Sequence, residues 1–246
     1  MSDHPGRVLL VEDDAAIRQF VALALEDRPV TVHACATVDE ALAVLREGPV
    51  DLVLTDLHLA GDSGLRLLEL LAADPALRGP ARLAVFSGEG GAHIPPAWVA
   101  LGVWRVVPKP ASVKALTDCV EAALAEEARP PMPPPGPVPA WPRGAAAAID
   151  SHFGGDQALY QAFRAGALTQ FPVDRTAGTQ ACLNRDAAAL RHLGHSLRTV
   201  LGLLGEPEAA LLAWQLQKVA EQPGVDVQRL GEVWRPLDAA LARLCR

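Results

Sequence analysis

The chain has 246 residues, half of them hydrophobic, and a formal net charge of -7 at pH 7. This length predicts two domains rather than one, and the hydrophobic fraction is sufficient for two cores. Residues 1–128 hold 19 acids and 10 bases, whereas residues 129–246 hold 10 acids and 12 bases without runs of Lys or Arg. The charge pattern therefore disfavours a nucleic-acid partner for either half.

The cysteines are widely separated and form neither a CxxC motif nor a Cys/His metal spacing, so we expect reduced thiols, as in a cytosolic protein. The first residues lack a basic segment followed by an apolar run, and no stretch approaches the length of about 18 apolar residues that a membrane span needs. We therefore expect a cytoplasmic protein without membrane insertion.

The first half alternates short apolar runs with helical patterns. Strands are predicted at 7–11, 30–35, 51–55, 82–87 and 105–108, and helices at 14–27, 37–47, 64–73, 96–101 and 111–128. Such alternation predicts an α/β fold with a five-stranded parallel, doubly wound sheet. In such sheets the functional site lies at the carboxyl ends of the strands.

Residues 130–142 contain eight prolines, which disfavour helix and sheet and indicate a linker. It serves either as a stiff spacer or as an unstructured one. After it the strand pattern disappears, and a helical pattern with Gly, Asn and Pro breaks predicts an all-α bundle. The predicted domains are 1–128, a linker at 129–144, and a helical domain at 145–246.

Carboxylates follow two of the predicted strands. Glu12 and Asp13 follow the first, and Asp56 follows the third. Because three acids at one sheet edge repel one another, their position implies a divalent cation between them, and oxygen ligands with water suit Mg²⁺. Asp56 is then the expected nucleophile, which forms an aspartyl phosphate.

The fourth and fifth strands end at a hydroxyl and a cation, Ser87 and Lys109, and both groups can bind phosphoryl oxygens. With the segments VEDD, LTDLHLAGDSG, FSG and PKP, residues 7–127 resemble the response-regulator receiver family. The resemblance implies a flavodoxin-like fold, Asp56 as phosphoacceptor, Ser87 as switch hydroxyl and Lys109 as phosphate sensor. It also implies the backbone carbonyl of His58 as a metal ligand and a cis Lys109-Pro110 bond. Asp14 is better explained as a helix N-cap.

Some positions depart from the receiver pattern. Val106 occupies the place of the usual aromatic switch residue, and Trp104 is out of register with it. Ala60 replaces a common proline. Gly and Pro residues at 88–96 predict a shortened or mobile fourth helix.

A helical wheel for residues 186–204 separates an apolar stripe from a polar face. The stripe consists of Leu190, Leu193, Leu197, Val200, Leu201 and Leu204. His195 falls almost opposite the stripe, as an exposed imidazole with Arg191 one turn before it and Arg198 three residues after. These arginines are candidate phosphate-binding neighbours of a phosphoaccepting His195.

Residues 186–205 resemble the histidine phosphotransfer pattern, with Asp186 as helix N-cap and Leu204-Gly205 at the expected distance from the histidine. This looser resemblance covers about 145–245. Arg198 replaces the usual Lys, and Thr199 replaces a Gly where a partner must approach closely. His192 is a second candidate, but its distance from Leu204-Gly205 is wrong.

The leading hypothesis is a phosphorelay protein with Mg²⁺ as cofactor. Its partners are a sensor histidine kinase and other receiver or phosphotransfer proteins, and transfer between Asp56 and His195 occurs in cis or in trans. No ATP-binding motif is present, so we expect a phosphoryl carrier rather than an enzyme. Alternatively, phosphorylated Asp56 controls a degenerate helical domain that only binds or dimerises. An Asp-nucleophile phosphatase is disfavoured, because the first module has no cap insertion.

Overall fold

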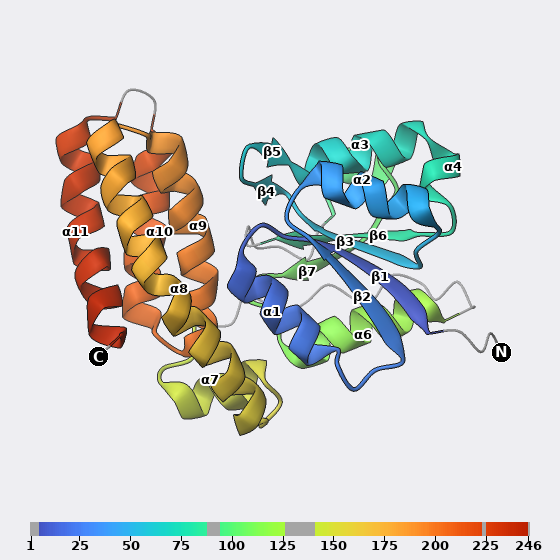
Figure 1. Ribbon diagram of the computed structural model, residues 1–246, viewed down its shortest axis with the longest axis horizontal. Helices are drawn as coiled ribbons and strands as arrows, with labels where there is room; N and C mark the ends of the chain where they lie inside the picture. The colour runs from blue at the N-terminus through green and yellow to red at the C-terminus, as the bar shows by residue number, and fades with distance from the viewer. Residues whose placement is uncertain (1–4, 88–93, 126–140, 223–224, 246) are drawn as a thin grey trace. The chain divides into compact units, whose positions relative to one another are not determined.

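The structure is a computed structural model, which describes residues 5–87, 94–125, 141–222 and 225–245. The chain divides into two compact units, Met1–Pro139 and Ala140–Arg246 (Figure 1). The predicted linker at 129–144 lies mostly outside the described residues. Within the described ranges, no helix combines the length and hydropathy that a bilayer span requires.

The first unit is built on a parallel sheet with the strand order β2-β1-β3-β6-β7. The strands are β1 (Gly6–Val11), β2 (Val30–Cys35), β3 (Leu52–Asp56), β6 (Arg82–Ser87) and β7 (Val103–Pro108). In the register, Val11 pairs with both Cys35 and Thr55, so that neighbouring strands end at one edge. Every residue of β3 is buried, as a continuous apolar run in a covered sheet requires.

Helices cover both faces of this sheet. Figure 1 shows α2 and α3 on one face and α1 and α6 on the other. The helices are α1 (Ala15–Ala24), α2 (Val38–Glu47), α3 (Gly64–Ala73), α4 (Pro75–Arg78), α5 (Pro96–Ala100) and α6 (Val113–Leu124). This arrangement confirms the predicted doubly wound, flavodoxin-like fold. The predicted N-cap of the first helix is confirmed, since Asp14 accepts hydrogen bonds from the backbone N–H groups of Ala16 and Ile17.

Two small features were not predicted. One is α4, and the other is a hairpin in which β4 (His58–Leu59) pairs with β5 (Asp62–Ser63) in antiparallel fashion. Two-residue strands are too short to produce a periodic pattern, and only Gly61, with φ 76°, marked the turn. The short fourth helix was predicted correctly, because α5 has five residues.

Trp104 lies in a cluster on the edge strand β7. The guanidinium groups of Arg82 and Arg105 lie 5.1 and 4.5 Å from the centroid of its ring. Arg82 also donates to the carbonyls of Ala122 and Ala125 at the end of α6. The aromatic side chain is thus part of the packing between β7 and α6, rather than a substitute for the switch residue at Val106.

The second unit is a helical bundle, as predicted. Its helices are α7 (Ala145–His152), α8 (Gln157–Asn184), α9 (Ala187–Leu204), α10 (Pro207–Ala220) and α11 (Val227–Leu244). Helix α9 packs against α8 and α10, and α11 packs against α10 and α8, while the short α7 packs against α9. The second unit is therefore a four-helix arrangement with one additional helix at its start.

Close contacts define how the bundle packs. Gly178 in α8 faces the ring of Trp234 in α11, where a side chain on residue 178 would collide with the indole. The indole N–H of Trp234 donates to Thr179, and the hydroxyl of Tyr160 donates to the carbonyl of Leu204. Buried aromatic rings with their polar ends satisfied give this bundle a specific packing.

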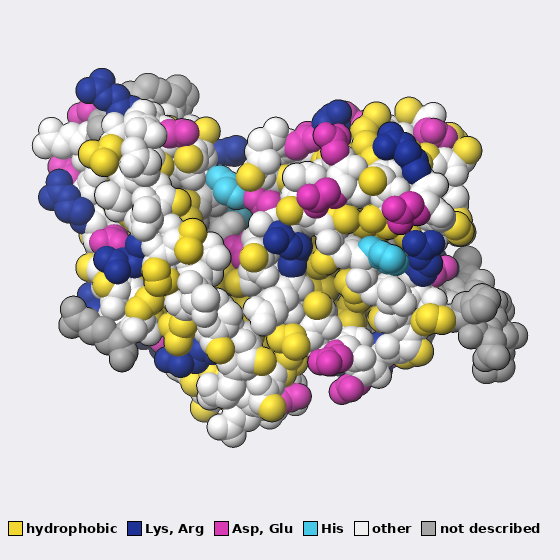
Figure 2. Space-filling model, viewed as in Figure 1, with side chains coloured by type: hydrophobic (Ala, Val, Ile, Leu, Met, Phe, Trp, Pro, Cys, Tyr) yellow, Lys and Arg dark blue, Asp and Glu magenta, His cyan; other side chains and the backbone are white. Residues whose placement is uncertain are grey.

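Charged side chains are interspersed over the described surface in the view of Figure 2. Lys and Arg alternate there with Asp and Glu, and neither sign forms an extended area on that face.

His152 makes the stability of the second unit sensitive to acid. The side chain is buried, and its Nε2 atom has no hydrogen-bond partner among the described residues. Burial lowers the pKa of His152 from 6.5 to about 4. Between pH 6.5 and 4 the imidazole is protonated in the unfolded chain but neutral in the folded chain. The contribution of His152 to the free energy of unfolding is therefore greatest above pH 6.5 and falls as the pH is lowered to 4. We expect a loss of about 3 kcal/mol from this group at pH 4.

The measurement is urea unfolding of the full chain at several pH values, monitored by the circular dichroism signal of the helices. The control is His152→Leu, which cannot titrate and should lose less stability over the same range. Equal pH dependence in the two proteins would refute the assignment.

Candidate functional site

The site in the first unit is formed by residues at the carboxyl ends of the strands. Asp56 is the last residue of β3, and Ser87 is the last residue of β6. Glu12 directly follows β1, and Lys109 directly follows β7. All four side chains are buried. The topology of a parallel sheet thus brings together groups that are far apart in the sequence, as predicted.

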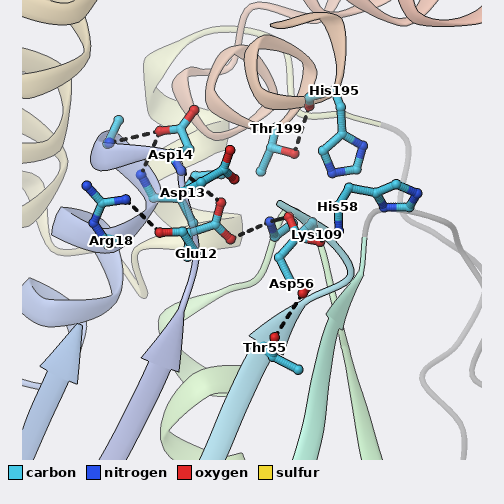
Figure 3. Close-up of polar contacts among 12 residues, drawn as sticks. Glu12, Asp13, Asp14, Arg18, Thr55, Asp56, His58, Lys109, His195 and Thr199 are labelled. Carbon is cyan, nitrogen blue, oxygen red and sulfur yellow. Dashed lines mark hydrogen bonds and ion pairs between the residues drawn. The ribbon is translucent and has the colours of Figure 1, made fainter. Parts of the chain in front are cut away.

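Lys109 lies between two carboxylates. Its Nζ is 2.5 Å from Oε2 of Glu12 and 2.5 Å from Oδ2 of Asp56 (Figure 3). Burial raises the pKa of Glu12 to about 8; Lys109 opposes this shift, and the charge of Asp56 adds to it. Burial alone would lower the pKa of Lys109, but Asp56 and Glu12 together raise it above its ordinary value. The lysine is therefore a permanent cation beside the predicted phosphoacceptor.

Backbone N–H groups hold the carboxylates in place. The N–H of His58 donates to Oδ1 of Asp56 at 3.0 Å, and the N–H of Ala60 donates to Oδ2 of Asp13 at 3.0 Å. Both donors belong to the β4–β5 hairpin region, which sequence reasoning missed. The hairpin thus connects the acidic residue after β1 to the acceptor at the end of β3.

The acidic residues fit a divalent cation. Glu12, Asp13 and Asp56 each present a carboxylate oxygen, and these oxygens lie within 4.8 Å of one another. An all-oxygen donor set of this size suits Mg²⁺ better than a softer metal. His58 lies next to Asp56 through its N–H, and its backbone carbonyl stays a predicted additional ligand.

Other expectations for the receiver-like unit can be compared with the structure. The Lys109-Pro110 bond is cis, as the resemblance implied. Val106 packs against the hydrophobic core, where the receiver pattern has an aromatic residue. The backbone N–H of Lys109 donates to the carbonyl of Ser87 at 2.7 Å, which links the ends of β6 and β7. Residues 88–93, which follow Ser87, lie outside the described residues.

His195 lies on α9, whose first turn is capped by Asp186 as predicted. Most of the predicted apolar stripe is buried, and His195 is on the opposite face of the helix by its spacing. The imidazole is itself buried rather than exposed, which corrects the prediction from the helical wheel. A helical wheel assigns side chains to the faces of one helix, and it does not give their burial in the folded chain.

The neighbours of His195 are partly as predicted. Arg191 and Arg198 share its helix, and the hydroxyl of Thr199 donates to the His195 carbonyl at 3.4 Å. The charge of Arg191 also acts on Glu221 of α10. Partial burial raises the pKa of Glu221, but hydrogen bonds from Lys218 and Gln217 outweigh this effect and, with Arg191, lower it below its ordinary value.

Gln217 is a buried polar residue that sequence reasoning missed. It lies in α10 where that helix approaches Gly194, so closely that a side chain on residue 194 would meet the backbone of Ala213 and Gln217. Its Nε2 donates to Glu221, whereas its Oε1 has no partner among the described residues. The only sequence signal was a polar residue at a core position between Ala213 and Ala220, which is weak on its own.

Comparison with known proteins identifies the first unit. Residues 8–121 match the family model of the response regulator receiver domain. The transcriptional regulatory protein GlrR of Escherichia coli (strain K12) is 28% identical over 129 residues, which are 52% of this chain and 28% of GlrR. The photosynthetic apparatus regulatory protein RegA of Cereibacter sphaeroides is 30% identical over 133 residues, which are 54% of this chain and 69% of RegA.

Among solved structures, the chemotaxis response regulator CheY4 of Vibrio cholerae aligns with 48% of this chain and 98% of its own, with 21% identity and a TM-score of 0.42. Of the two curated relatives, the chain spans little more than a quarter of GlrR but over two thirds of RegA. By its similarity to RegA and by the match of residues 8–121, the chain belongs to the response regulator receiver domain family, whose members accept a phosphoryl group on an aspartate in two-component signalling.

Proposed function

We propose that this protein is a phosphorelay intermediate with a phosphoacceptor in each unit. Asp56 accepts a phosphoryl group from a sensor histidine kinase or a phosphotransfer protein, and His195 exchanges one with a receiver aspartate in the same or another chain. The observation that carries this proposal is the position of Lys109, whose Nζ contacts the carboxylates of Glu12 and Asp56. The proposed domains are 1–128, a linker at 129–144, and 145–246.

The chemistry at Asp56 is a phosphoryl exchange. A carboxylate oxygen of Asp56 forms a bond to phosphorus while the bond from phosphorus to the donor imidazole nitrogen breaks, and the imidazole leaves with the electron pair. In this proposal, Lys109 contacts one phosphoryl oxygen and Ser87 donates a hydrogen bond to another. The backbone N–H of His58 keeps the acceptor carboxylate oriented.

Receiver domains bind Mg²⁺ at an acidic pocket, and the acids of this chain fit that ion. We propose that Asp13, Asp56 and Glu12 hold it, with the backbone carbonyl of His58 as a further ligand. When bound, Mg²⁺ offsets the negative charge that gathers as a phosphoryl group approaches the carboxylates. Asp13 is held by Ala60 and is therefore already oriented for this role.

The helical unit is proposed to be a histidine phosphotransfer domain. The support is its four-helix arrangement and the position of His195 on one middle helix, with Arg191 and Arg198 near it in the sequence. Imidazole nitrogen is a suitable phosphoacceptor near neutral pH, and guanidinium groups bind phosphoryl oxygens in pairs. The chain is then a phosphoryl carrier, not an enzyme that turns over a small substrate.

A second candidate function is favoured by Thr199. Its side chain is buried one turn after His195, where it adds bulk to the histidine face. In this alternative, the helical unit only binds a partner or a second copy, and phosphorylation of Asp56 controls its availability.

The experiment uses the full chain with Mg²⁺ and either radiolabelled acetyl phosphate or radiolabelled phosphoramidate. The variants are Asp56→Asn and His195→Gln. We expect an alkali-labile label that Asp56→Asn removes, and an acid-labile, alkali-stable label that His195→Gln removes.

The outcomes separate the two functions. Label that is confined to Asp56 in every case would reject the relay and favour the binding module. Label that survives in Asp56→Asn as an acyl phosphate would reject Asp56 as the acceptor.

A further inference from the structure

Arg18 contacts the acidic segment from the first helix. Its Nη1 donates to the backbone carbonyl of Glu12 at 2.6 Å. Its own backbone N–H donates to the carbonyl of Asp14 at 3.0 Å, within the first turn of α1. Figure 3 shows the guanidinium directed at the backbone of Glu12, while the Glu12 carboxylate points the other way, toward Lys109. The arginine thus fixes the peptide from which the acidic side chains extend.

Three consecutive carboxylates make this segment difficult to hold. Like charges on Glu12, Asp13 and Asp14 repel one another, and each side chain has a separate set of contacts. Glu12 contacts Lys109, Asp13 accepts from Ala60, and Asp14 caps α1. The backbone must therefore adopt one conformation that sends three adjacent side chains in three directions.

We propose that Arg18 is a positioning residue for the cation site of the receiver unit. It holds the Glu12 carbonyl, and thereby sets the directions in which the carboxylates of Glu12 and Asp13 leave the backbone. This inference rests on the proposed binding of Mg²⁺ by these acids. Because its hydrogen bond goes to a carbonyl and not to a carboxylate, Arg18 restrains the segment without occupying a ligand oxygen.

The direction in which Mg²⁺ affinity changes when Arg18 is removed distinguishes a positioning role from a purely electrostatic one. Arg18 is a cation near an acidic site, so through charge alone its removal would strengthen the binding of a divalent cation. Removal of a positioning residue has the opposite effect, because the ligands must then be ordered at the moment of binding. Loss of such a supporting contact weakens metal binding by about 10- to 100-fold.

The test is calorimetric titration of the full chain with Mg²⁺, for wild type, Arg18→Ala and Arg18→Lys. The matched control is Arg28→Ala, because Arg28 forms an ion pair at an exposed site, 2.7 Å from Glu121. Thermal unfolding is measured for each protein, so that a folding defect is recognised. Labelling of Asp56 by acetyl phosphate is then measured as a function of Mg²⁺ concentration.

We expect Arg18→Ala to weaken Mg²⁺ binding by about tenfold, Arg18→Lys to recover part of the affinity, and Arg28→Ala to bind as wild type. Labelling of Arg18→Ala should need more Mg²⁺ but reach the wild-type extent at saturation. Unchanged or tighter binding by Arg18→Ala would overturn the inference while leaving the proposed function intact. Failure of the wild type to bind Mg²⁺ would overturn both.

Discussion

Lys109→Met is expected to destabilise the first unit by about 3 kcal/mol at neutral pH, since removal of one partner leaves buried charges uncompensated. The side chains of Lys109, Glu12 and Asp56 are almost fully buried, and the ammonium contacts both carboxylates. Burial already raises the pKa of Glu12 to about 8 with the lysine present. Without the lysine, a proton must replace the cation, and the pKa of Glu12 rises further.

The pH dependence of this loss has a definite sign. A carboxyl group whose pKa is higher in the folded than in the unfolded chain costs nothing below its ordinary pKa, and costs more as the pH rises above it. In the wild type this group already stays protonated up to a pH of about 8, so the deficit of Lys109→Met should be nearly constant below pH 8 and should grow as the pH rises above it. Urea unfolding in the presence of a chelator measures it.

The control is Lys114→Met, because the Lys114 side chain is 79% exposed in its ion pair with Asp118. We expect this variant to unfold as wild type does. Mg²⁺ should stabilise Lys109→Met more than wild type, because the added cation offsets the same carboxylates. A deficit that does not grow as the pH is raised above 8 would contradict this electrostatic account of Lys109.

Gly64→Ala should destabilise the first unit by about 3 kcal/mol and abolish labelling of Asp56, because the added methyl group overfills a packed site. Gly64 is the first residue of α3, and a Cβ at this position would overlap the backbone carbonyl oxygen of Asp56. The same atom would lie 2.6 Å from Oγ1 of Thr55, which donates to that carbonyl. To make room, the end of β3 must move, and the acceptor moves with it.

A second glycine in the same segment provides the control. Gly61 has φ 76°, but no atom of the described residues lies within 4 Å of a Cβ built there. Gly61→Ala should therefore cost only the backbone strain of about 1–2 kcal/mol. Its labelling should remain normal. If the two variants unfold at the same urea concentration and are labelled equally, the close contact at Gly64 matters neither for stability nor for phosphorylation of Asp56.

The fold of the first unit could be predicted because its signals are local and repeated. The fully buried run of β3 and the N-cap at Asp14 each identify an element without reference to the rest of the chain. The strand-end position of Asp56, and with it the acidic site, follows from the rule that parallel strands end at one edge. The β4–β5 hairpin was not predicted, because its two-residue strands are too short to show an alternating pattern.

The support around the site could not be predicted, for a physical reason. The hydrogen bond from Ala60 to Asp13 joins segments that are far apart in the sequence, and the bond from Arg18 to Glu12 depends on how the chain bends between β1 and α1. Arg18 appears in the sequence only as a polar position on an amphipathic helix, and Gln217 as a polar position beside alanines. The burial of His195 was missed for a related reason, since a helical wheel describes one helix at a time.

The connection between β1 and α1 contains three residues, and all three are acids. Which acid contacts Lys109, which accepts from Ala60 and which caps the helix is decided only by the count of residues from the end of the strand. A deletion or insertion of one residue would preserve the composition of this loop and yet reassign every role within it. Natural variation at this loop should therefore be confined to substitutions, while changes in length accumulate elsewhere in the chain.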